Sequence, residues 1–402
     1  MTSRTVLISG AGIAGPTLAY WLGRHGFAPT VVERAAAPRS SGSPVDVRGP
    51  AVAVAQRMGV LPDIRRAGTE VTELTFVNAA GRRAGRINIR ALRRATGSGE
   101  VELPRGDLAT ILQRVAREHA EFVYGDRITA LHQDERGVDV TFEHAAPRRF
   151  DLVVGADGLH SAVRALAFGP EREFVEHLGI YVATAPLPGT ENPHAVVLHN
   201  VPGRLVAVHP STGGALAFFA FRGPELAGFD PNDTASHKRI LTGAFAGGGW
   251  RVPELLDRMQ AAADLYFDSV SRVNLRPWSR GRVALLGDAA SCVSLFGDGS
   301  TLAMTGAATL ADALAAHPDD HVQAFRRFEA EHRVRVDPKL HGIERASTLL
   351  IPATRTGIVT RNLLANLWPL GAAAGWLTRT AARSSRHDYA NVEHGYANAG
   401  HG

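Results

Sequence analysis

The sequence predicts an α/β fold in which a parallel sheet is joined to an α+β second domain. Three apolar runs, beginning near Thr5, Asp151 and Arg282, each end in a glycine-containing turn and are followed by a helical pattern. A series of short strand-like segments, broken by Gly and Pro, fills residues 171–275. Parallel strands are buried on both faces and read as continuous apolar runs, whereas strands that alternate or break at turns are typical of antiparallel sheets. We therefore expect both kinds of sheet.

Length and composition are those of a globular protein. The 402 residues predict two or three domains. A content of 45% hydrophobic and 21% charged residues excludes a disordered chain, a collagen-like fibre and a coiled coil. Because Cys292 is the only cysteine, an internal disulfide, a Cys-based zinc site and thioredoxin-type chemistry are excluded. A lone thiol favours a reducing compartment, so we expect a cytoplasmic protein.

The basic charge does not indicate a nucleic-acid partner. The net charge is +5, and Lys238 and Lys339 are the only lysines among the 44 basic residues. The densest basic runs are pairs such as Arg82-Arg83, whereas a nucleic-acid-binding face gathers its charges. We expect no nucleic-acid partner, and a monomer or a weak homodimer.

The first apolar run leads into a dinucleotide-binding motif. The strand-like run 5–9 is followed by Gly10-Ala-Gly12-Ile-Ala14-Gly15 and then by a helical pattern over 16–26. Gly10 makes the tight turn, Gly12 lets the backbone approach a pyrophosphate, and Gly15 lets helix and strand pack closely. The helix N-terminus then faces the phosphates. The alternative is a glycine-rich turn in an ordinary βαβ unit.

The second strand of this unit ends in an acid. The strand-like run 30–33 ends at Glu33, which lies 18 residues beyond Gly15 and can accept hydrogen bonds from ribose hydroxyls. A carboxylate there repels a 2′-phosphate and so argues against NADP at this site. The unit predicts a Rossmann-like nucleotide-binding domain but does not separate NAD from FAD.

Two further motifs follow the same plan. Residues 151–164 form an apolar strand, a turn that contains Asp157-Gly158, and a helix. Residues 282–290 form another buried strand that ends at Gly287-Asp288. A glycine turn, Gly297-Asp298-Gly299, then precedes an apolar helix over 302–315.

These three motifs, in this order, resemble those of the group A flavoprotein monooxygenases, the para-hydroxybenzoate hydroxylase class. The chain is most similar to the single-chain branch with tetracycline-inactivating and polyketide-tailoring enzymes, some of which act in antibiotic biosynthesis. The resemblance covers roughly residues 4–390. It implies a Rossmann-like FAD-binding domain, an interleaved sheet domain for the substrate, and C-terminal helices. It also implies FAD as cofactor and NAD(P)H as reductant.

The resemblance assigns cofactor roles to residues of the motifs. It implies pyrophosphate, adenosine, ribityl and flavin contacts for Gly10, Gly12, Ala14, Gly15, Glu33, Arg34, Asp157, Gly158, Gly287, Asp288 and Gly299. Arg105, in the segment 104–108, is implied to contact the flavin, and Asp46 or Arg48 to lie beside the isoalloxazine or the substrate. Positive charge suits an anionic reduced flavin. The alternatives are a helix cap for Asp157, a surface position for Arg105 and a local ion pair for Asp46 and Arg48.

The substrate cavity is expected beside the middle sheet. Tyr181, Ala217 and Phe219 fall where relatives place substrate contacts, and the two rings suggest a flat apolar ligand. Core packing is the alternative for each. Phe218 and Phe221 alternate differently and are expected to face helices.

The resemblance implies that NAD(P)H reduces FAD and that a C4a-hydroperoxyflavin, formed with O2, hydroxylates or epoxidises a polycyclic or aromatic polyketide-like small molecule. The chemistry is centred on the flavin, so no catalytic side chain is named. No HExxH, no 2-His-1-carboxylate spacing and no GxSxG elbow occurs, and we expect no metal. The alternatives are a redox-neutral cyclase on the same scaffold and a flavin-dependent reductase.

One segment departs from the family pattern. After Asp288 the usual prolines are missing, and the loop from Ser291 through Ser294 to Gly299 contains Asp298 in its glycine turn. A carboxylate aimed at the flavin would oppose its anionic reduced form. The altered loop is the feature that puts oxygen transfer in question.

The expected domains are discontinuous. We expect an FAD-binding domain at 1–70, 100–170 and 276–320, a substrate domain at 71–99 and 171–275, C-terminal helices at 321–382 and a mobile tail at 383–402. Candidate strands are 179–185, 195–200, 205–209, 215–221 and 264–275, antiparallel strands are expected within 121–144, and candidate helices are 233–246 and 253–259. Breaks are expected at Pro338 and Pro352.

The late apolar segment does not predict a membrane span. Residues 363–377 contain Pro369 and are too few to cross a bilayer. We expect a core-packing helix pair there, with a membrane-surface helix as the alternative.

Overall fold

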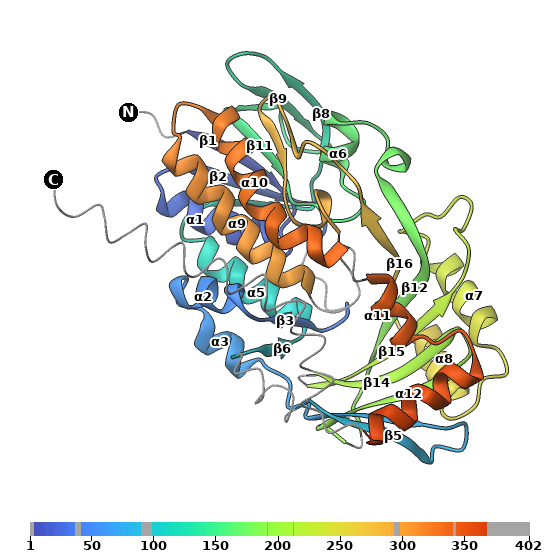
Figure 1. Ribbon diagram of the computed structural model, residues 1–402. Coiled ribbons are helices and arrows are strands. Elements are labelled where there is room, and N and C mark those ends of the chain that lie inside the picture. Colours follow the sequence, from blue (N-terminus) through green and yellow to red (C-terminus); the bar gives the residue numbers. More distant parts are fainter. Residues whose placement is uncertain are drawn as a thin grey trace.

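The computed structural model describes residues 4–36, 42–89, 99–190, 192–211, 213–292, 298–340 and 343–367. These residues form two lobes, which occupy the two sides of Figure 1. One lobe holds a six-stranded sheet with helices packed on it, and the other holds a seven-stranded sheet. The predicted combination of an α/β domain with an α+β sheet domain is confirmed.

The six-stranded sheet brings the three predicted apolar runs together. Its order is β17-β18-β11-β1-β2-β7, and it is parallel except at β17. The strands are β1 (Thr5–Ser9), β2 (Ala28–Glu33), β7 (Glu121–Tyr124), β11 (Leu152–Gly155), β17 (Ser279–Arg280) and β18 (Val283–Leu285). Because β1, β11 and β18 are neighbouring parallel strands, their carboxyl ends meet at one edge. The three glycine-containing turns therefore lie side by side.

Helices cover this sheet. They are α1 (Ala14–Arg24), α2 (Pro50–Arg57), α3 (Leu61–Arg66), α5 (Arg105–Ala116), α6 (Ala162–Ala167), α9 (Asp298–Ala316) and α10 (His321–Leu340), and α9 packs against both α1 and α10 (Figure 1). The helix predicted at 302–315 begins at Asp298. The break expected at Pro338 is wrong, because α10 continues to Leu340. A proline so near a helix end removes only one hydrogen bond of the last turn.

The seven-stranded sheet has the order β16-β12-β15-β14-β13-β4-β5. Its strands are β4 (Glu73–Val77), β5 (Arg83–Asn88), β12 (Val175–Leu187), β13 (Ala195–Val201), β14 (Arg204–Ser211), β15 (Gly214–Arg222) and β16 (Tyr266–Val273). The five candidate strands between 179 and 275 are confirmed. Helices α7 (Thr234–Phe245) and α8 (Val252–Ala261) confirm the two candidate helices and pack on one face of the sheet.

Two small sheets complete the strand pairing. The strands β8 (Ile128–Gln133), β9 (Val138–Phe142) and β10 (Arg148–Phe150) are antiparallel, as expected for most of 121–144. The exception is β7, which pairs with β2 in the parallel sheet. The pair β3 (Val45–Val47) and β6 (Val101–Leu103) places the segment 45–49 beside the start of α5.

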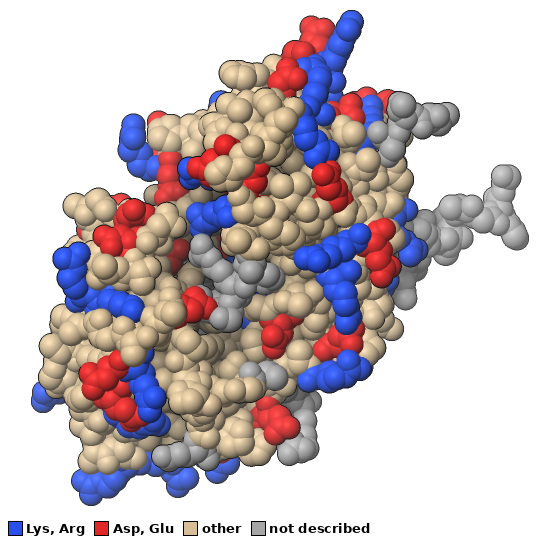
Figure 2. Space-filling view, turned by 180° about the vertical axis from the view of Figure 1, so that it is seen from behind, with Lys and Arg blue, Asp and Glu red and all other residues tan. Residues whose placement is uncertain are grey.

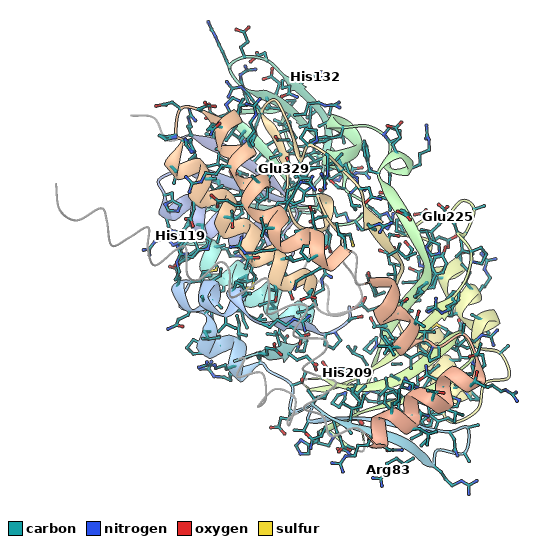
Figure 3. The ribbon with its side chains drawn as sticks, in the orientation of Figure 1. Arg83, His119, His132, His209, Glu225 and Glu329 are labelled. Carbon is teal, nitrogen blue, oxygen red and sulfur yellow. The ribbon has the colours of Figure 1, made fainter. Side chains whose placement is uncertain are left out.

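The two lobes are joined by polar contacts as well as by the chain. Figure 3 shows His209 of β14 between the lobes, and its Nε2 lies 3.2 Å from Oε1 of Glu102 in β6. The strands of the second sheet come from 73–88 and 175–273, and those of the first from 5–33, 121–155 and 279–285. The domain boundaries predicted from the sequence remain a proposal.

The remaining elements are the helices α11 (Ile343–Leu350) and α12 (Arg355–Leu367) and the short helices η1 (Glu171–Glu173) and η2 (Gly287–Ala289). The predicted tail at 383–402 and most of the apolar segment 363–377 lie outside the described residues. Among the described residues, no helix has the length and apolar character needed to span a membrane. On the face shown in Figure 2, basic and acidic side chains are interspersed.

Candidate cofactor and substrate site

The turn after β1 contains three glycines, of which the middle one has room for a side chain and the outer two do not. A Cβ on Gly10, where φ is +104°, would lie 2.5 Å from the carbonyl oxygen of Ala156. A Cβ on Gly15 would lie 1.9 Å from the carbonyl oxygen of Gly10. A Cβ on Gly12 would meet nothing within 4 Å. Gly10 and Gly15 are therefore required by packing, whereas Gly12 borders open space at the N-terminus of α1, as a pyrophosphate site requires.

The carboxylate at the end of β2 faces this turn. Oε2 of Glu33 accepts a hydrogen bond from the backbone N–H of Ala11 at 2.8 Å, and Oε1 accepts one from the N–H of Ala35 at 2.9 Å. Arg34, next to it, is exposed. Glu33 is thereby held beside the glycine turn, where its remaining lone pairs suit ribose hydroxyls.

The turn after β11 shows Asp157 as an anchor of helix α6. Its carboxylate accepts hydrogen bonds from Oγ of Ser161 at 2.5 Å and from the N–H of Val163 at 3.1 Å. Burial raises the pKa of Asp157, against these hydrogen bonds. Gly158 has a φ of +84° and open space where a Cβ would stand. The N-cap residue of α6 is Ser161, whose Oγ accepts a hydrogen bond from the N–H of Arg164, and Asp157 supports this cap. Its contact with FAD stays a prediction.

The turn after β18 carries a carboxylate that feels the charge of a guanidinium at the start of α5. Gly287, with a φ of +63°, packs so closely that a Cβ would lie 3.2 Å from Cβ of Ala14. Burial raises the pKa of Asp288, whereas the charge of Arg105, at the start of α5, opposes that rise. Neither side chain forms a hydrogen bond with another described residue, and Oδ1 of Asp288 lies 3.7 Å from where a Cβ on Gly299 would stand. Unpaired donors and acceptors here fit a ribityl chain and a flavin.

Asp298 does not stand uncompensated. Its Oδ1 lies 2.6 Å from Nη2 of Arg48 and 2.5 Å from Nζ of Lys339, at the end of α10. Burial alone would raise the pKa of Asp298, but the two cations hold it below its ordinary value. Arg48 also lies 3.7 Å from Oδ2 of Asp46. The charge that the sequence leaves in question is therefore compensated by two cations, Arg48 and Lys339, which stand far from Asp298 in the sequence. Residues 293–297 lie outside the described part.

We expect opposite shifts of the flavin midpoint potential when the anion or a cation is removed from the charge cluster of Asp46, Arg48, Asp298 and Lys339. Asp298→Asn leaves two cations and should raise the midpoint potential of bound FAD, whereas Lys339→Met should lower it. Both should destabilise the fold by about 1–3 kcal/mol, because each removes a charged hydrogen bond. Spectroelectrochemical titration and urea unfolding measure the two effects. Shifts of the same sign in both variants would contradict an electrostatic role for the cluster.

The residues expected to contact substrate lie in a different place. Tyr181, Ala217 and Phe219 are at most 1% exposed and belong to the core between the seven-stranded sheet and helices α7 and α8. The hydroxyl of Tyr181 donates to the carbonyl of Pro224 at 3.3 Å and accepts from the N–H of Leu226 at 2.8 Å. Their placement matches the core-packing alternative and does not support direct substrate contact.

The opposite face of the sheet looks toward the first lobe. Thr184 pairs directly with Phe218 of β15 and Tyr266 of β16, so the three side chains form one row across neighbouring strands. Phe218 is half-buried against the larger core, which includes β1 and β11. The expectation that Phe218 faces the helices is therefore wrong, whereas Phe221 does face them.

Tyr266 connects this row to the cofactor side. Burial raises the pKa of its phenol, Asp268 adds to the rise, and the charge of Arg105 opposes it. A phenol with a raised pKa remains a hydrogen-bond donor. Thr184 is fully buried, and its hydroxyl has no hydrogen-bond partner among the described residues. Alternation in the sequence assigns residues to the two faces of a strand but does not show which face lies toward the FAD-binding lobe. This row was therefore not identified from the sequence.

Comparison with known proteins bears on these observations. A family model described as "FAD binding domain" matches residues 3–324. The uncharacterized protein Rv1260 of Mycobacterium tuberculosis is 40% identical over 333 residues, which cover 82% of this chain and 89% of that protein. A flavin-dependent monooxygenase of Legionella longbeachae is 33% identical over 83% of this chain and 86% of its own length.

Among solved structures, the tetracycline destructase Tet(51) is similar with a TM-score of 0.80 and 29% identity, over 93% of this chain and 98% of that one. The family match spans most of the chain and includes all three glycine-containing turns. The chain therefore belongs to the FAD-binding-domain family and is an FAD-dependent oxidoreductase of the group A monooxygenase type.

Proposed function

We propose that this protein is an NAD(P)H- and O2-dependent monooxygenase that hydroxylates or epoxidises a flat polycyclic or aromatic small molecule of the polyketide type. The observation that carries the proposal is that one face of the seven-stranded sheet meets the turns of the FAD-binding lobe. The charges of Asp288 and Arg105, in that lobe, act on Tyr266, which belongs to the row Tyr266–Thr184–Phe218 of the sheet. We expect the protein to act in the cytoplasm, as a monomer or a weak homodimer.

The residues present fit FAD. The open side of Gly12 would receive the pyrophosphate, Glu33 with Arg34 the adenosine ribose, and Asp288 the ribityl chain. Bound FAD would supply the electron transfer and oxygen activation that side chains lack. Arg105 would place positive charge beside bound FAD, where negative charge develops on reduction. These residues bind and orient, and no side chain is required as nucleophile or metal ligand.

The face of the seven-stranded sheet that looks toward the FAD-binding lobe would form the substrate side of the site. The ring of Phe218 offers an aromatic surface, and the protonated phenol of Tyr266 offers a hydrogen-bond donor. An apolar wall with one or two polar groups is typical of sites that orient flat ligands and exclude water. This combination favours a fused-ring compound with a carbonyl or phenol oxygen.

An anaerobic titration tests the proposal. The visible flavin absorbance of the purified holoenzyme is measured as NADPH, or in parallel NADH, is added without oxygen. We expect the band to bleach and to return when air is admitted. With a panel of hydroxylated anthraquinones and related fused-ring phenols, we expect one or more to raise the rates of NADPH oxidation and O2 consumption together.

Two results would overturn the proposal. A flavin that neither nucleotide reduces, even with the panel present, would exclude the reductive half-reaction. A product formed without reductant and without O2 would instead identify a redox-neutral cyclase on this scaffold.

A further inference from the structure

A histidine links the FAD-binding lobe to the seven-stranded sheet. His160 lies in the turn between β11 and α6, in the FAD-binding lobe. Its Nε2 is 3.1 Å from Oδ1 of Asp268 on β16, and its Nδ1 is 2.9 Å from Oε1 of Glu171 in η1. Its side chain is 20% exposed and that of Asp268 11%. A single imidazole thus bridges two carboxylates, that of Glu171 in η1 and that of Asp268 in the seven-stranded sheet.

The network continues to the turn after β18. The second oxygen of Glu171 accepts a hydrogen bond from Nη2 of Arg164 at 3.1 Å. Arg164 is fully buried, and its Nη1 donates to the carbonyl of Ala289 at 3.1 Å. Ala289 follows Asp288 directly. The chain of contacts therefore runs from β16 through His160, Glu171 and Arg164 to the turn that carries Asp288.

Both ends of this network adjoin residues of the candidate site. Asp268 stands two residues from Tyr266 on the same strand, so the two side chains share the face that looks toward the first lobe. The charge of Asp268 also raises the pKa of Asp288. Two such carboxylates repel, and a cation between the elements that carry them offsets this repulsion.

We propose that His160 is a positioning residue: as an imidazolium it holds the start of β16, with Tyr266 and Asp268, in register with the turns that carry Asp157 and Asp288. It touches neither substrate nor cofactor in this role. It acts by fixing the substrate sheet against the FAD-binding lobe. The inference does not depend on the proposed reaction, because it concerns the geometry of the holoenzyme before any substrate binds.

The charge on His160 is set by its surroundings. The groups that face it are Asp268 from β16, Glu171 from η1 and, beyond Glu171, Arg164 from α6. Burial lowers its pKa, but the two carboxylates outweigh burial and raise it to about 9. A raised pKa means that the stabilisation is complete below the unfolded value of about 6.5 and is lost as the pH rises through about 9. The link should therefore weaken under mildly alkaline conditions.

Hydrogen exchange on the wild-type holoenzyme is the first test, because it needs no variant. We expect the protection of peptides that cover 264–275, corrected for intrinsic exchange, to fall as the pH is raised from 7 to 9.5, while peptides that cover β1 keep theirs. FAD affinity, followed by flavin fluorescence, should weaken over the same range. Unchanged protection of 264–275 across this range would overturn the proposal.

Two substitutions separate charge from shape. His160→Gln removes the cation, and at pH 7 we expect about 10-fold weaker FAD binding and faster exchange of 264–275, with no further change at pH 9. His160→Arg keeps a cation that can bond two carboxylates, so protection should be retained and the alkaline loss abolished. An Arg variant that still loses protection near pH 9 would show that another group titrates.

A matched control is His209→Gln. His209 also joins the lobes through a carboxylate, Glu102, but no contact connects it to the turns after β11 and β18 among the described residues. We expect it to leave the exchange of 264–275 and the alkaline step unchanged. Asp268→Asn should reproduce His160→Gln, and the double variant should be no worse than either. Additive effects, or an equal effect of His209→Gln, would overturn the assignment.

Discussion

Replacing Gly12 with alanine is expected to leave the fold intact and to weaken FAD binding by about 10- to 100-fold, or about 1.4–2.8 kcal/mol. The added methyl meets no protein atom within 4 Å, so it costs nothing in packing. It would occupy the space through which a pyrophosphate approaches the backbone. The loss of a glycine should even stabilise the apoprotein slightly, because the unfolded chain becomes less flexible.

Gly15→Ala is the matched variant three residues later. Its methyl would stand 1.9 Å from the carbonyl oxygen of Gly10, and backbone must shift to admit it. We expect a loss of about 3 kcal/mol or more in unfolding free energy. Urea unfolding of the apoproteins and FAD titration by fluorescence distinguish the two variants. Wild-type FAD affinity in Gly12→Ala would refute the assignment of this turn to the pyrophosphate.

Truncating Phe219 should mainly lower the stability of the fold, whereas truncating its neighbour Phe218 should mainly weaken ligand binding. Phe219 is fully buried and packs edge-on against Phe245 at 5.3 Å between centroids, so Phe219→Ala should cost about 3–5 kcal/mol of stability. Phe218 is half-buried on the face that looks toward the first lobe. Phe218→Ala should cost only about 1 kcal/mol but should raise the KM of any ligand that stimulates NADPH oxidation.

The comparison is made by urea unfolding of both holoenzymes, followed by ligand-stimulated NADPH oxidation at saturating O2. The residual activity of Phe219→Ala, corrected for the folded fraction, should show a KM close to wild type. A raised KM in Phe219→Ala with a normal KM in Phe218→Ala would return the substrate to the helix side of the sheet, where the sequence first placed it.

Much of the fold could be predicted from local patterns. The run Thr5–Ser9, the glycine turn and the acid at Glu33 follow from strand, turn and helix preferences that act over a few residues. Five of the seven strands of the second sheet are predicted because glycine and proline interrupt alternating runs. The break expected at Pro338 failed because a helix end tolerates the missing hydrogen bond, which a local rule for helix interiors does not consider.

The site was predicted less evenly. Motif residues are identified because a close backbone approach demands glycine, and the structure shows that demand at Gly10 and Gly15. The row Tyr266–Thr184–Phe218 was missed because alternation is symmetric. Phe218 and Phe219 carry the same side chain, and only the packing of Phe218 against the first lobe tells them apart. The pairing of Asp298 with Lys339 was also missed, since the partner stands on another helix.

By itself the sequence determined that the chain builds an α/β FAD-binding lobe, places Gly10 and Gly15 where backbone segments pass close to one another, and ends three apolar strands in glycine-containing turns. These are consequences of local sterics and burial, which neighbouring residues suffice to set. Only the tertiary structure decided which face of the second sheet lies toward the FAD-binding lobe, how the charge of Asp298 is compensated, and that His160 joins the two lobes. Those features depend on side chains distant in sequence, and their energies exist only when folding brings the charges and surfaces together.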